Sequence, residues 1–190
     1  MRLRLVREPF DHPDYIFELK HDGFRVIAYL QHGESKLVSR NQRNLGFEAL
    51  KRSLAKLPVE NAILDGEVIC VEAKAVSQFN QLLSRKGEPV FYAFDLLWLD
   101  GADLRRTPLL EREARLAELV RVSNCPRLLY AQRVEGTGKE LFSEICRRDL
   151  GGIVAKRKTG VYREDRQDWL KVKNPTYSQA QGRHDLFREG

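Results

Sequence analysis

Apolar and polar residues alternate with a period of two over eight stretches of this chain. Because successive side chains of a β-strand point to opposite faces, the alternation predicts strands that bury one face in a core. The predicted strands are residues 17–20, 26–30, 36–39, 63–71, 90–99, 128–134, 153–158 and 169–173.

Three other stretches carry apolar residues at the three- or four-residue spacing of a helix, over residues 50–57, 109–120 and 141–146. These helices lie between the predicted strands, a distribution that indicates an α+β fold with sheets covered by helices. The chain has no internal repeat, no low-complexity segment and no long linker. We therefore expect a single domain over residues 1–190.

The composition indicates a globular chain that suits an anionic partner. Its 190 residues are 42% hydrophobic, which is enough for a core. Lys and Arg outnumber Asp and Glu by 33 to 27, an excess that favours a nucleotide or nucleic acid, although a well-solvated basic surface is the other interpretation. The 3 cysteines lack the spacing of a disulfide framework or zinc site, and no apolar run suits a signal peptide or membrane span. We expect a cytoplasmic protein that has no membrane partner.

The segment FELKHDGFR contains a candidate nucleophile. Strand alternation places Glu18 and Lys20 on one face, and the Asp-Gly pair that follows predicts a turn before Arg25. A lysine that attacks phosphorus must lose its proton, which is easier where desolvation or neighbouring cations disfavour the ammonium form. Considered alone, the segment also fits an ordinary exposed hairpin lysine.

Two carboxylates share one face of the predicted strand AILDGEVICV. They are Asp65 and Glu67, and Gly66 between them leaves room for another chain segment to approach closely. Paired carboxylates beside a nucleotide suit a ribose hydroxyl or a divalent ion bound to phosphate. A hairpin with solvated acids is the alternative for this segment alone.

The predicted strand PVFYAFDLLWLDG is dense in aromatic residues, among them Phe91, Tyr92, Phe94 and Trp98. We expect most of these rings in the core, since aromatic-rich strands usually pack a sheet, while one ring could face a purine base. In DWLKVKN, Lys171 and Lys173 share a strand face. Two ammonium groups so close together suit a triphosphate between them.

Taken in order, these segments resemble the motif series of the covalent nucleotidyltransferases, the superfamily of ATP-dependent DNA ligases, RNA ligases and mRNA capping enzymes. The similarity is greatest to bacterial DNA ligases of the end-joining type, and it covers nearly the whole chain, including the tail NPTYSQAQGRHDLF. The matching segments are KHDGFR (20–25), SRN (39–41), LDGE (64–67), FYAFDLLWLDG (91–101), GGIVAKR (151–157) and WLKVKN (169–174). The resemblance implies an ATP-grasp-like nucleotidyltransferase (DNA ligase adenylation) fold with antiparallel sheets flanked by helices.

The resemblance implies a role for each matching residue around the base and the sugar of ATP. Lys20 would be catalytic and would form a phosphoramidate with AMP. Phe94 would stack on adenine, with Glu18 at the adenine edge. Arg25 and Glu67 would hold the ribose and nearby groups.

Other matching residues would contact phosphates. Lys171 and Lys173 would bind the phosphates, and Lys171 would act as a second catalytic residue that neutralises charge as pyrophosphate leaves. Lys156 would belong to the same nucleotide-binding set, and Arg40 would contact a phosphate or the nick.

The family chemistry also implies cofactors and partners. ATP would be used with Mg²⁺ or Mn²⁺, for which Glu67 and Asp149 are the candidate ligands. AMP would pass to the 5′-phosphate of nicked double-stranded DNA and leave when the nick is sealed during DNA repair and recombination. We therefore expect a bacterial, cytoplasmic and nucleoid-associated enzyme.

Two departures from the family pattern matter. Gly151 stands where the family has a metal-binding glutamate, and Asp149, two residues earlier, would lie about 6–7 Å away along a strand. The sequence also ends soon after WLKVKN, so we expect no OB domain here and a repair partner that supplies DNA clamping. The alternatives are a nucleotide- or nick-binding module that has lost turnover and acts with a partner, and an RNA ligase or capping-type enzyme.

Overall fold

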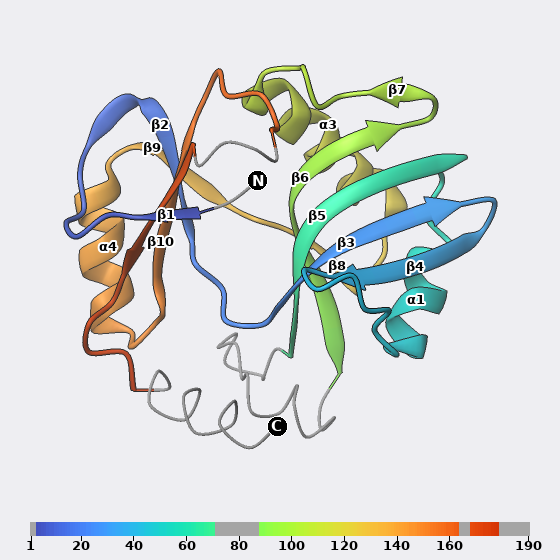
Figure 1. Cartoon of the computed structure of the whole chain (residues 1–190), viewed down its shortest axis with the longest axis horizontal. Coiled ribbons are helices and arrows are strands. Elements are labelled where there is room, and N and C mark those ends of the chain that lie inside the picture. Colours follow the sequence, from blue (N-terminus) through green and yellow to red (C-terminus); the bar gives the residue numbers. More distant parts are fainter. Residues whose placement is uncertain (1–2, 71–87, 164–167, 179–190) are drawn as a thin grey trace. The chain divides into compact units, whose positions relative to one another are not determined.

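The structure, a computed structural model, describes residues 3–70, 88–163 and 168–178 (Figure 1). The chain divides into two compact units, each built on one sheet. The five-stranded unit comprises residues 3–21, 132–157 and 168–178, and the six-stranded unit comprises residues 22–70, 88–131 and 158–163. The expectation of one domain over residues 1–190 stays a prediction.

The five-stranded unit is a sheet with one helix against it (Figure 1). Across the sheet the strands are β1 (Leu3–Leu5), β11 (Trp169–Lys173), β10 (Gly152–Arg157), β2 (His12–Leu19) and β9 (Arg133–Gly136). Strand β1 is parallel to β11, and the other pairs are antiparallel. Helix α4 (Gly138–Arg147) packs on β2 and β10.

The core of this unit lies between α4 and the sheet. Its buried members are Phe17, Ile145, Ile153, Ala155, Leu170 and Val172. Ile153 and Ala155 of β10, Leu170 and Val172 of β11, and Phe17 of β2 with the partly buried Tyr15 and Leu19 occupy alternate positions. The residues between them therefore face the opposite side of the sheet. That opposite face carries most of the residues that the sequence singles out in this unit.

The six-stranded unit contains a larger sheet and two helices. The strands in order are β4 (Glu34–Ser39), β3 (Phe24–Gln31), β5 (Asn61–Cys70), β6 (Pro89–Leu99) and β7 (Ala102–Asp103), with β8 (Leu128–Tyr130) beside β6. Helices α1 (Glu48–Leu54) and α3 (Leu109–Ser123) contribute Leu50, Leu54, Leu116 and Leu119 to the core of this sheet. Both helices therefore cover the same face, and the other face is the one that bears Arg25 and Glu67.

The hydrophobic pattern predicted the elements well. Seven of the eight alternating stretches each fall on one strand and the three helical stretches each fall on one helix, although residue 71 of one predicted strand lies outside the described residues. The prediction of one strand over 128–134 is wrong, because the chain leaves one sheet after β8 and enters the other at β9. Strands β1 and β7 were not predicted, since each is too short for a periodic signal.

The expectation of purely antiparallel sheets is also corrected. Strand β1 pairs in parallel with β11, and β8 pairs in parallel with β6. The expected close approach at Gly66 is confirmed, because a Cβ there would lie 2.5 Å from the Phe91 ring of the neighbouring strand. A residue with a side chain at this position would force β5 and β6 apart.

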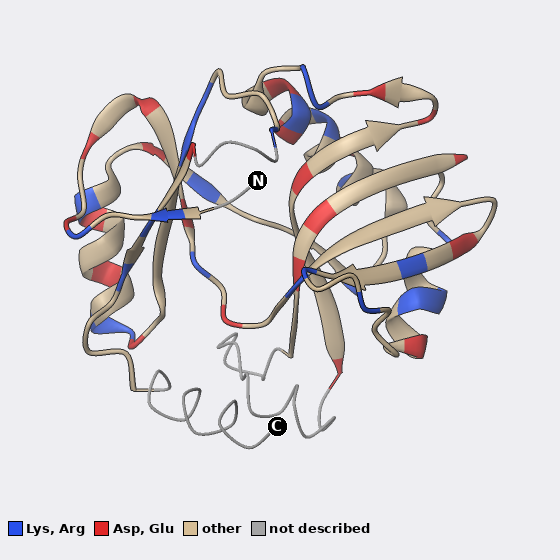
Figure 2. Ribbon diagram, in the orientation of Figure 1, with Lys and Arg blue, Asp and Glu red and all other residues tan. Residues whose placement is uncertain are grey.

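Two general features bear on the choice of partner. Figure 2 shows basic and acidic residues interspersed along α1, α3 and α4 and along both sheets, so the Lys and Arg of the described residues are not gathered on one element. Among the described helices, none is long and apolar enough to cross a membrane.

Candidate active site

In the five-stranded unit, the strand register brings four predicted site residues onto one face. Glu18 of β2 and Lys171 of β11 both pair with Val154 of β10, which lies between them. One row further along, Lys173 pairs with Gly152, and the Lys20 N–H donates to the Gly152 carbonyl at 2.9 Å. The candidate nucleophile and the two candidate phosphate lysines therefore stand in adjacent rows of one sheet face.

Glu18 forms an ion pair that the sequence did not predict. Lys156 Nζ donates to Glu18 Oε1 at 2.6 Å, and both side chains are buried. The Lys156 ammonium also lies 4.5 Å from the centroid of the Trp169 ring. Removing one partner of such a pair leaves a buried charge uncompensated, at a typical cost of about 3–5 kcal/mol. The pair thus holds the Glu18 carboxylate in a defined orientation.

Lys20 directly follows β2 and is half-buried. Loss of solvent around His21, with the adjacent Lys20 charge, lowers the pKa of His21 to about 4, so its imidazole is neutral near pH 7. Lys20 thus stands beside a neutral ring rather than a second cation. The exposed-hairpin interpretation of Lys20 does not describe this half-buried position.

Gly151 and Gly152 are adjacent residues near Lys20, and only one of these two positions requires glycine. Gly152 has φ +126°, and a Cβ there would collide with the Val172 carbonyl, so the backbone needs glycine. Gly151 has no such constraint. A Cβ on Gly151 would lie 3.4 Å from the Lys20 carbonyl oxygen, 3.6 Å from the Tyr177 ring and 3.9 Å from Lys20 Nζ. A side chain at position 151 would therefore begin beside the candidate nucleophile.

Asp149 does not lie on a strand, contrary to the geometry assumed from the sequence. It follows α4 with φ +52°, before β10 begins, and its side chain is exposed. Its carboxylate accepts hydrogen bonds from the Ser178 N–H at 2.9 Å and from the Ser178 hydroxyl. The hydroxyl bond lowers the pKa of Asp149 below its ordinary value. This carboxylate is thus engaged locally in the turn after α4.

In the six-stranded unit, the candidate carboxylates and Arg25 share the face opposite the helices. Arg25 pairs with Glu67 across β3 and β5, and its guanidinium donates from Nε at 3.1 Å and Nη2 at 2.6 Å to the two oxygens of Asp65. Asp65 is fully buried, so the alternative of a solvated hairpin acid is wrong for this residue. Burial alone would lower the pKa of Arg25, but the Asp65 carboxylate outweighs it and raises that pKa above its ordinary value.

Glu67 is tied to the turn that follows Lys20. Its Oε1 accepts a hydrogen bond from the Gly23 N–H at 3.1 Å. A Cβ at Gly23 would collide with the Val68 carbonyl, which explains the glycine of this turn. Within the described residues, no cluster of three or more His, Cys, Asp or Glu side chains is arranged to hold a metal ion. The metal-ligand roles of Glu67 and Asp149 stay predictions.

The expectation that most aromatic rings of β6 lie in the core is wrong. Phe91 is fully buried, whereas Tyr92, Phe94 and Trp98 are only partly buried. Alternation explains this, because Phe91 and Ala93 point to the core while Tyr92 and Phe94 point to the other face. The Arg25 guanidinium lies 5.6 Å from the centroid of the Phe94 ring. Phe94 therefore shares its face with the Arg25–Asp65 pair.

Residues 4–173 match the family model of the ATP dependent DNA ligase domain. The chain belongs to this family. It is 30% identical over 177 residues to the multifunctional non-homologous end joining protein LigD of Pseudomonas aeruginosa, covering 89% of this chain and 21% of that protein. It is 28% identical over 188 residues to the SPbeta prophage-derived DNA ligase-like protein LigB of Bacillus subtilis, covering 95% and 68%. The chain thus spans about a fifth of the LigD protein.

Solved structures agree with the sequence comparisons. A mycobacterial DNA ligase D complexed with ATP and MES superposes with a TM-score of 0.76 at 26% identity, covering 90% of this chain and 60% of that one. The ligase domain of Mycobacterium tuberculosis LigD gives a TM-score of 0.77 at 28% identity, covering 90% and 58%. The nucleotidyltransferase fold expected from the motif series is confirmed.

This ligase-family chain contains further polar residues that sequence reasoning missed. Tyr162 donates its hydroxyl to Asp65 Oδ2 at 2.9 Å. Arg112 donates from Nε and Nη2 to both oxygens of Asp95 at 2.7 Å, and neither side chain is exposed. An aspartate inside the apolar run FYAFDLLWL was a usable signal, because a buried carboxylate needs a cationic partner. Tyr162 had no such signal, since it lies outside every periodic stretch.

Arg40 occupies an exposed turn. The turn follows β4 and is closed by bonds from the Gln42 N–H to the Ser39 carbonyl at 2.8 Å and from the Arg43 N–H to the Ser39 hydroxyl at 3.2 Å. These bonds define the backbone around Arg40. Its expected contact with a phosphate or a nick stays a prediction.

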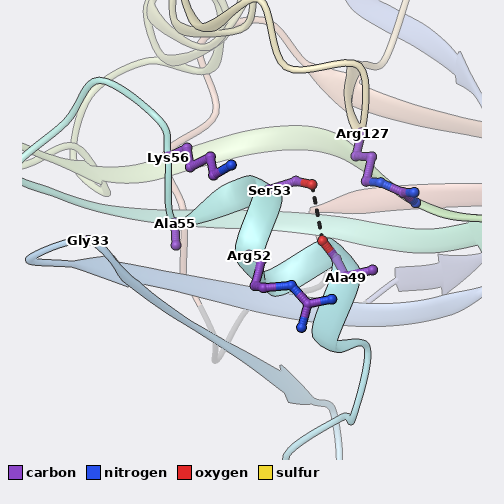
Figure 3. A pocket seen from close by; sticks show the side chains of 7 residues that line it. All are labelled: Gly33, Ala49, Arg52, Ser53, Ala55, Lys56 and Arg127. Atoms are coloured by element: carbon purple, nitrogen blue, oxygen red, sulfur yellow. Dashed lines mark hydrogen bonds between the residues drawn. The ribbon is translucent and has the colours of Figure 1, made fainter.

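The six-stranded unit has an open hollow of about 460 Å³ that no predicted site residue lines. Figure 3 shows the residues around it. Because α1 packs on the core face of the sheet, this hollow lies on the opposite side from Arg25 and Phe94. A bond from the Ser53 hydroxyl to the Ala49 carbonyl at 3.0 Å lies within it. Its lining residues are Gly33, Ala49, Arg52, Ser53, Ala55, Lys56 and Arg127.

Proposed function

We propose that this chain is an adenylating DNA ligase domain in which Lys20 is the nucleophile. The neutral Lys20 amine attacks the α-phosphorus of ATP, an N–P bond forms, the bond to the β-phosphate oxygen breaks, and pyrophosphate leaves. Lys171 and Lys173 stabilise the charge that develops on the phosphates. AMP then passes to a DNA 5′-phosphate, and a 3′-hydroxyl displaces it to seal the nick.

One observation carries this proposal: Lys20 and Glu18 stand in adjacent rows of one sheet face with Lys173 and Lys171. A nucleophile and two phosphate-binding cations must act on one triphosphate, and this register places them a few residues apart on a rigid sheet. Family membership supports the chemistry, because the matched family uses ATP. The Glu18–Lys156 pair supports a fixed acceptor for the adenine amino group.

We propose Mg²⁺ or Mn²⁺ as the accompanying cation. Mg²⁺ usually binds through one or two carboxylates together with phosphates and water, so it does not require a ready cluster of protein ligands. Glu67 accepts a hydrogen bond from the Gly23 N–H at Oε1. We favour it as the protein contribution because both oxygens of Asp149 accept hydrogen bonds from Ser178. When bound, the cation would neutralise phosphate charge during transfer.

The decisive experiment is self-adenylation. The protein is incubated with Mg²⁺ and ATP labelled at the α-phosphate, and the chain is separated by denaturing electrophoresis. Label should remain on the chain, whereas ATP labelled at the γ-phosphate should leave none. Absence of α-label under these conditions would contradict the proposal.

A second stage separates an autonomous ligase from the alternative of a module with impaired turnover. Nicked duplex carrying a 5′-phosphate is added to the labelled protein, and transfer to DNA and sealing are followed separately. Gly151 is the observation that favours the alternative, because no carboxylate extends toward Lys20 from this position. Labelling without sealing, followed by sealing when a repair protein that clamps DNA is added, would support the alternative.

A further inference from the structure

The segment 158–163 connects β10 to β11 but is bound to the six-stranded unit. Three hydrogen bonds hold it there. Arg112 Nη1 donates to the Gly160 carbonyl at 3.0 Å, the Tyr162 N–H donates to the Arg105 carbonyl at 2.7 Å, and the Leu110 N–H donates to the Lys158 carbonyl at 3.2 Å. The backbone of Tyr162 is therefore fixed independently of its side chain.

The Tyr162 side chain reaches the carboxylate that holds Arg25. Its hydroxyl donates to Asp65 Oδ2 at 2.9 Å, and the same oxygen accepts from Arg25 Nη2 at 2.6 Å. Burial of Tyr162, reinforced by the Asp65 charge, raises the pKa of its hydroxyl well above the ordinary value, so it remains a donor at neutral pH. The buried Asp65 carboxylate thus receives hydrogen bonds from two directions.

This arrangement determines the plane of the Arg25 guanidinium. Two parallel hydrogen bonds to Asp65 fix the guanidinium, and its Cζ atom lies 5.6 Å from the centroid of the Phe94 ring. A carboxylate free to rotate would let the guanidinium tilt, whereas the Tyr162 hydroxyl prevents that rotation. Asp65 is therefore an intermediary between Tyr162 and the face that bears Arg25 and Phe94.

We propose that Tyr162 is a positioning residue that acts through Asp65 to orient Arg25 for recognition of the ATP ribose. The inference rests on the proposed function and on the role that the family resemblance implies for Arg25, a contact with the ribose of ATP. Tyr162 itself need not touch the nucleotide. Its contribution is to keep Arg25 in its binding orientation before ATP arrives, which lowers the cost of ordering that side chain on binding.

The test is Tyr162→Phe, which keeps the ring and removes only the hydroxyl. Self-adenylation is followed as the rate of labelling in a single turnover at several ATP concentrations. The KM for ATP obtained from this dependence should rise by about three- to tenfold, while the limiting rate at saturating ATP stays near the original value. The preference for ATP over 2′-deoxy- and 3′-deoxy-ATP should shrink, because a tilted Arg25 loses its contact with a sugar hydroxyl. The matched control is Tyr29→Phe, at a tyrosine of β3 that is 42% exposed.

A double-variant cycle shows whether the effect passes through Arg25. If it does, Tyr162→Phe should add little to the KM of Arg25→Lys, because the two changes disturb one arrangement. A lower melting temperature with unchanged KM and unchanged sugar preference would mean a merely structural tyrosine and would overturn the inference. Additive effects of the two substitutions would overturn the route through Arg25.

Equilibrium binding of ATP, measured by calorimetry on the same variants, separates the two proposals. If the original chain binds ATP but does not label itself, the proposed chemistry fails, and a weaker affinity of Tyr162→Phe still supports the positioning role. If the original chain labels itself and Tyr162→Phe has the same affinity and KM for ATP, the positioning role is overturned and the proposed chemistry stands. If the original chain neither binds ATP nor labels itself, the proposed function and the positioning role of Tyr162 are both overturned.

Discussion

Apart from the buried Glu18–Lys156 pair of the five-stranded sheet, the two sheets present their charged site residues in different ways. On the five-stranded sheet, Lys171 is half-buried and Lys173 is exposed, and both belong to the face on which Lys20 follows β2. On the six-stranded sheet, Arg25 and Arg112 each form two hydrogen bonds with a fully buried aspartate. The first arrangement suits binding of an incoming anion, and the second suits a rigid surface that holds its shape before the ligand binds.

The comparison also explains which residues tolerate change. Loss of a partly exposed lysine leaves no fully buried charge behind, so it affects chemistry more than folding. A buried ion pair behaves in the opposite way, because removing one member leaves the other charge without compensation in a region of low polarity. The following predictions test this difference, beginning with the largest expected effect.

Lys20→Ala should abolish AMP labelling while the fold survives, because no other residue combines the position after β2 with a neighbouring Glu18. Labelling is measured with α-labelled ATP and folding by circular dichroism and thermal melting. Lys36→Ala, at an exposed lysine of β4, is the control and should label normally. Label that persists on the Lys20→Ala variant would contradict the assignment of Lys20 as the nucleophile.

Asp95→Ala should lower the free energy of unfolding by about 3–5 kcal/mol, because it leaves the buried Arg112 guanidinium unbalanced. Urea denaturation followed by fluorescence measures this loss. Glu118→Ala, which breaks an exposed pair with Arg121 on α3, is the matched control and should change stability little. Equal losses in the two variants would remove the distinction between buried and exposed pairs.

Gly151→Glu should raise the rate of adenylation or sealing at limiting Mg²⁺ by roughly tenfold, and the gain should shrink when the metal is saturating. The structure supports the design, because a Cβ at position 151 meets only ordinary contacts and starts 3.9 Å from Lys20 Nζ. Gly151→Gln controls for size without charge.

The neighbouring glycine supplies a further control for this experiment. Gly152→Ala should impair folding instead, since a Cβ there collides with the Val172 carbonyl. A folded Gly151→Glu variant whose rate is unchanged at every metal concentration would show that this position is not the missing ligand. Asp149→Ala would then be the next variant to test.

DNA affinity should be weak and should fall steeply with salt, because the net charge is only +6. Arg40→Ala should reduce the slope of log affinity against log salt by about one unit, because this exposed arginine is the residue expected to contact a phosphate at the nick. Arg121→Ala, at an arginine paired with Glu118, should leave the slope unchanged. Fluorescence anisotropy with nicked duplex at several salt concentrations measures both. Tight binding that barely changes with salt would contradict the prediction.

Much of the fold and part of the candidate site could be predicted because their signals are local. Alternation alone placed Leu170 and Val172 in the core and Lys171 and Lys173 on the other face. Local pattern failed where a segment changes sheet, as between β8 and β9, because each half has the same strand signal. It also failed for Asp149, whose turn depends on the C-terminal end of α4 and on Ser178.

By itself, the sequence determined which residues share a strand face and which chemical groups those faces carry, since side-chain direction follows from the backbone period. The tertiary structure alone decided which of these side chains form polar contacts with one another. Glu18 and Lys156 are 138 residues apart, and Asp65 and Tyr162 are 97 apart. The first pair follows from the order and register of the strands, and the second from the binding of segment 158–163 to the six-stranded unit. No local pattern carries either kind of information.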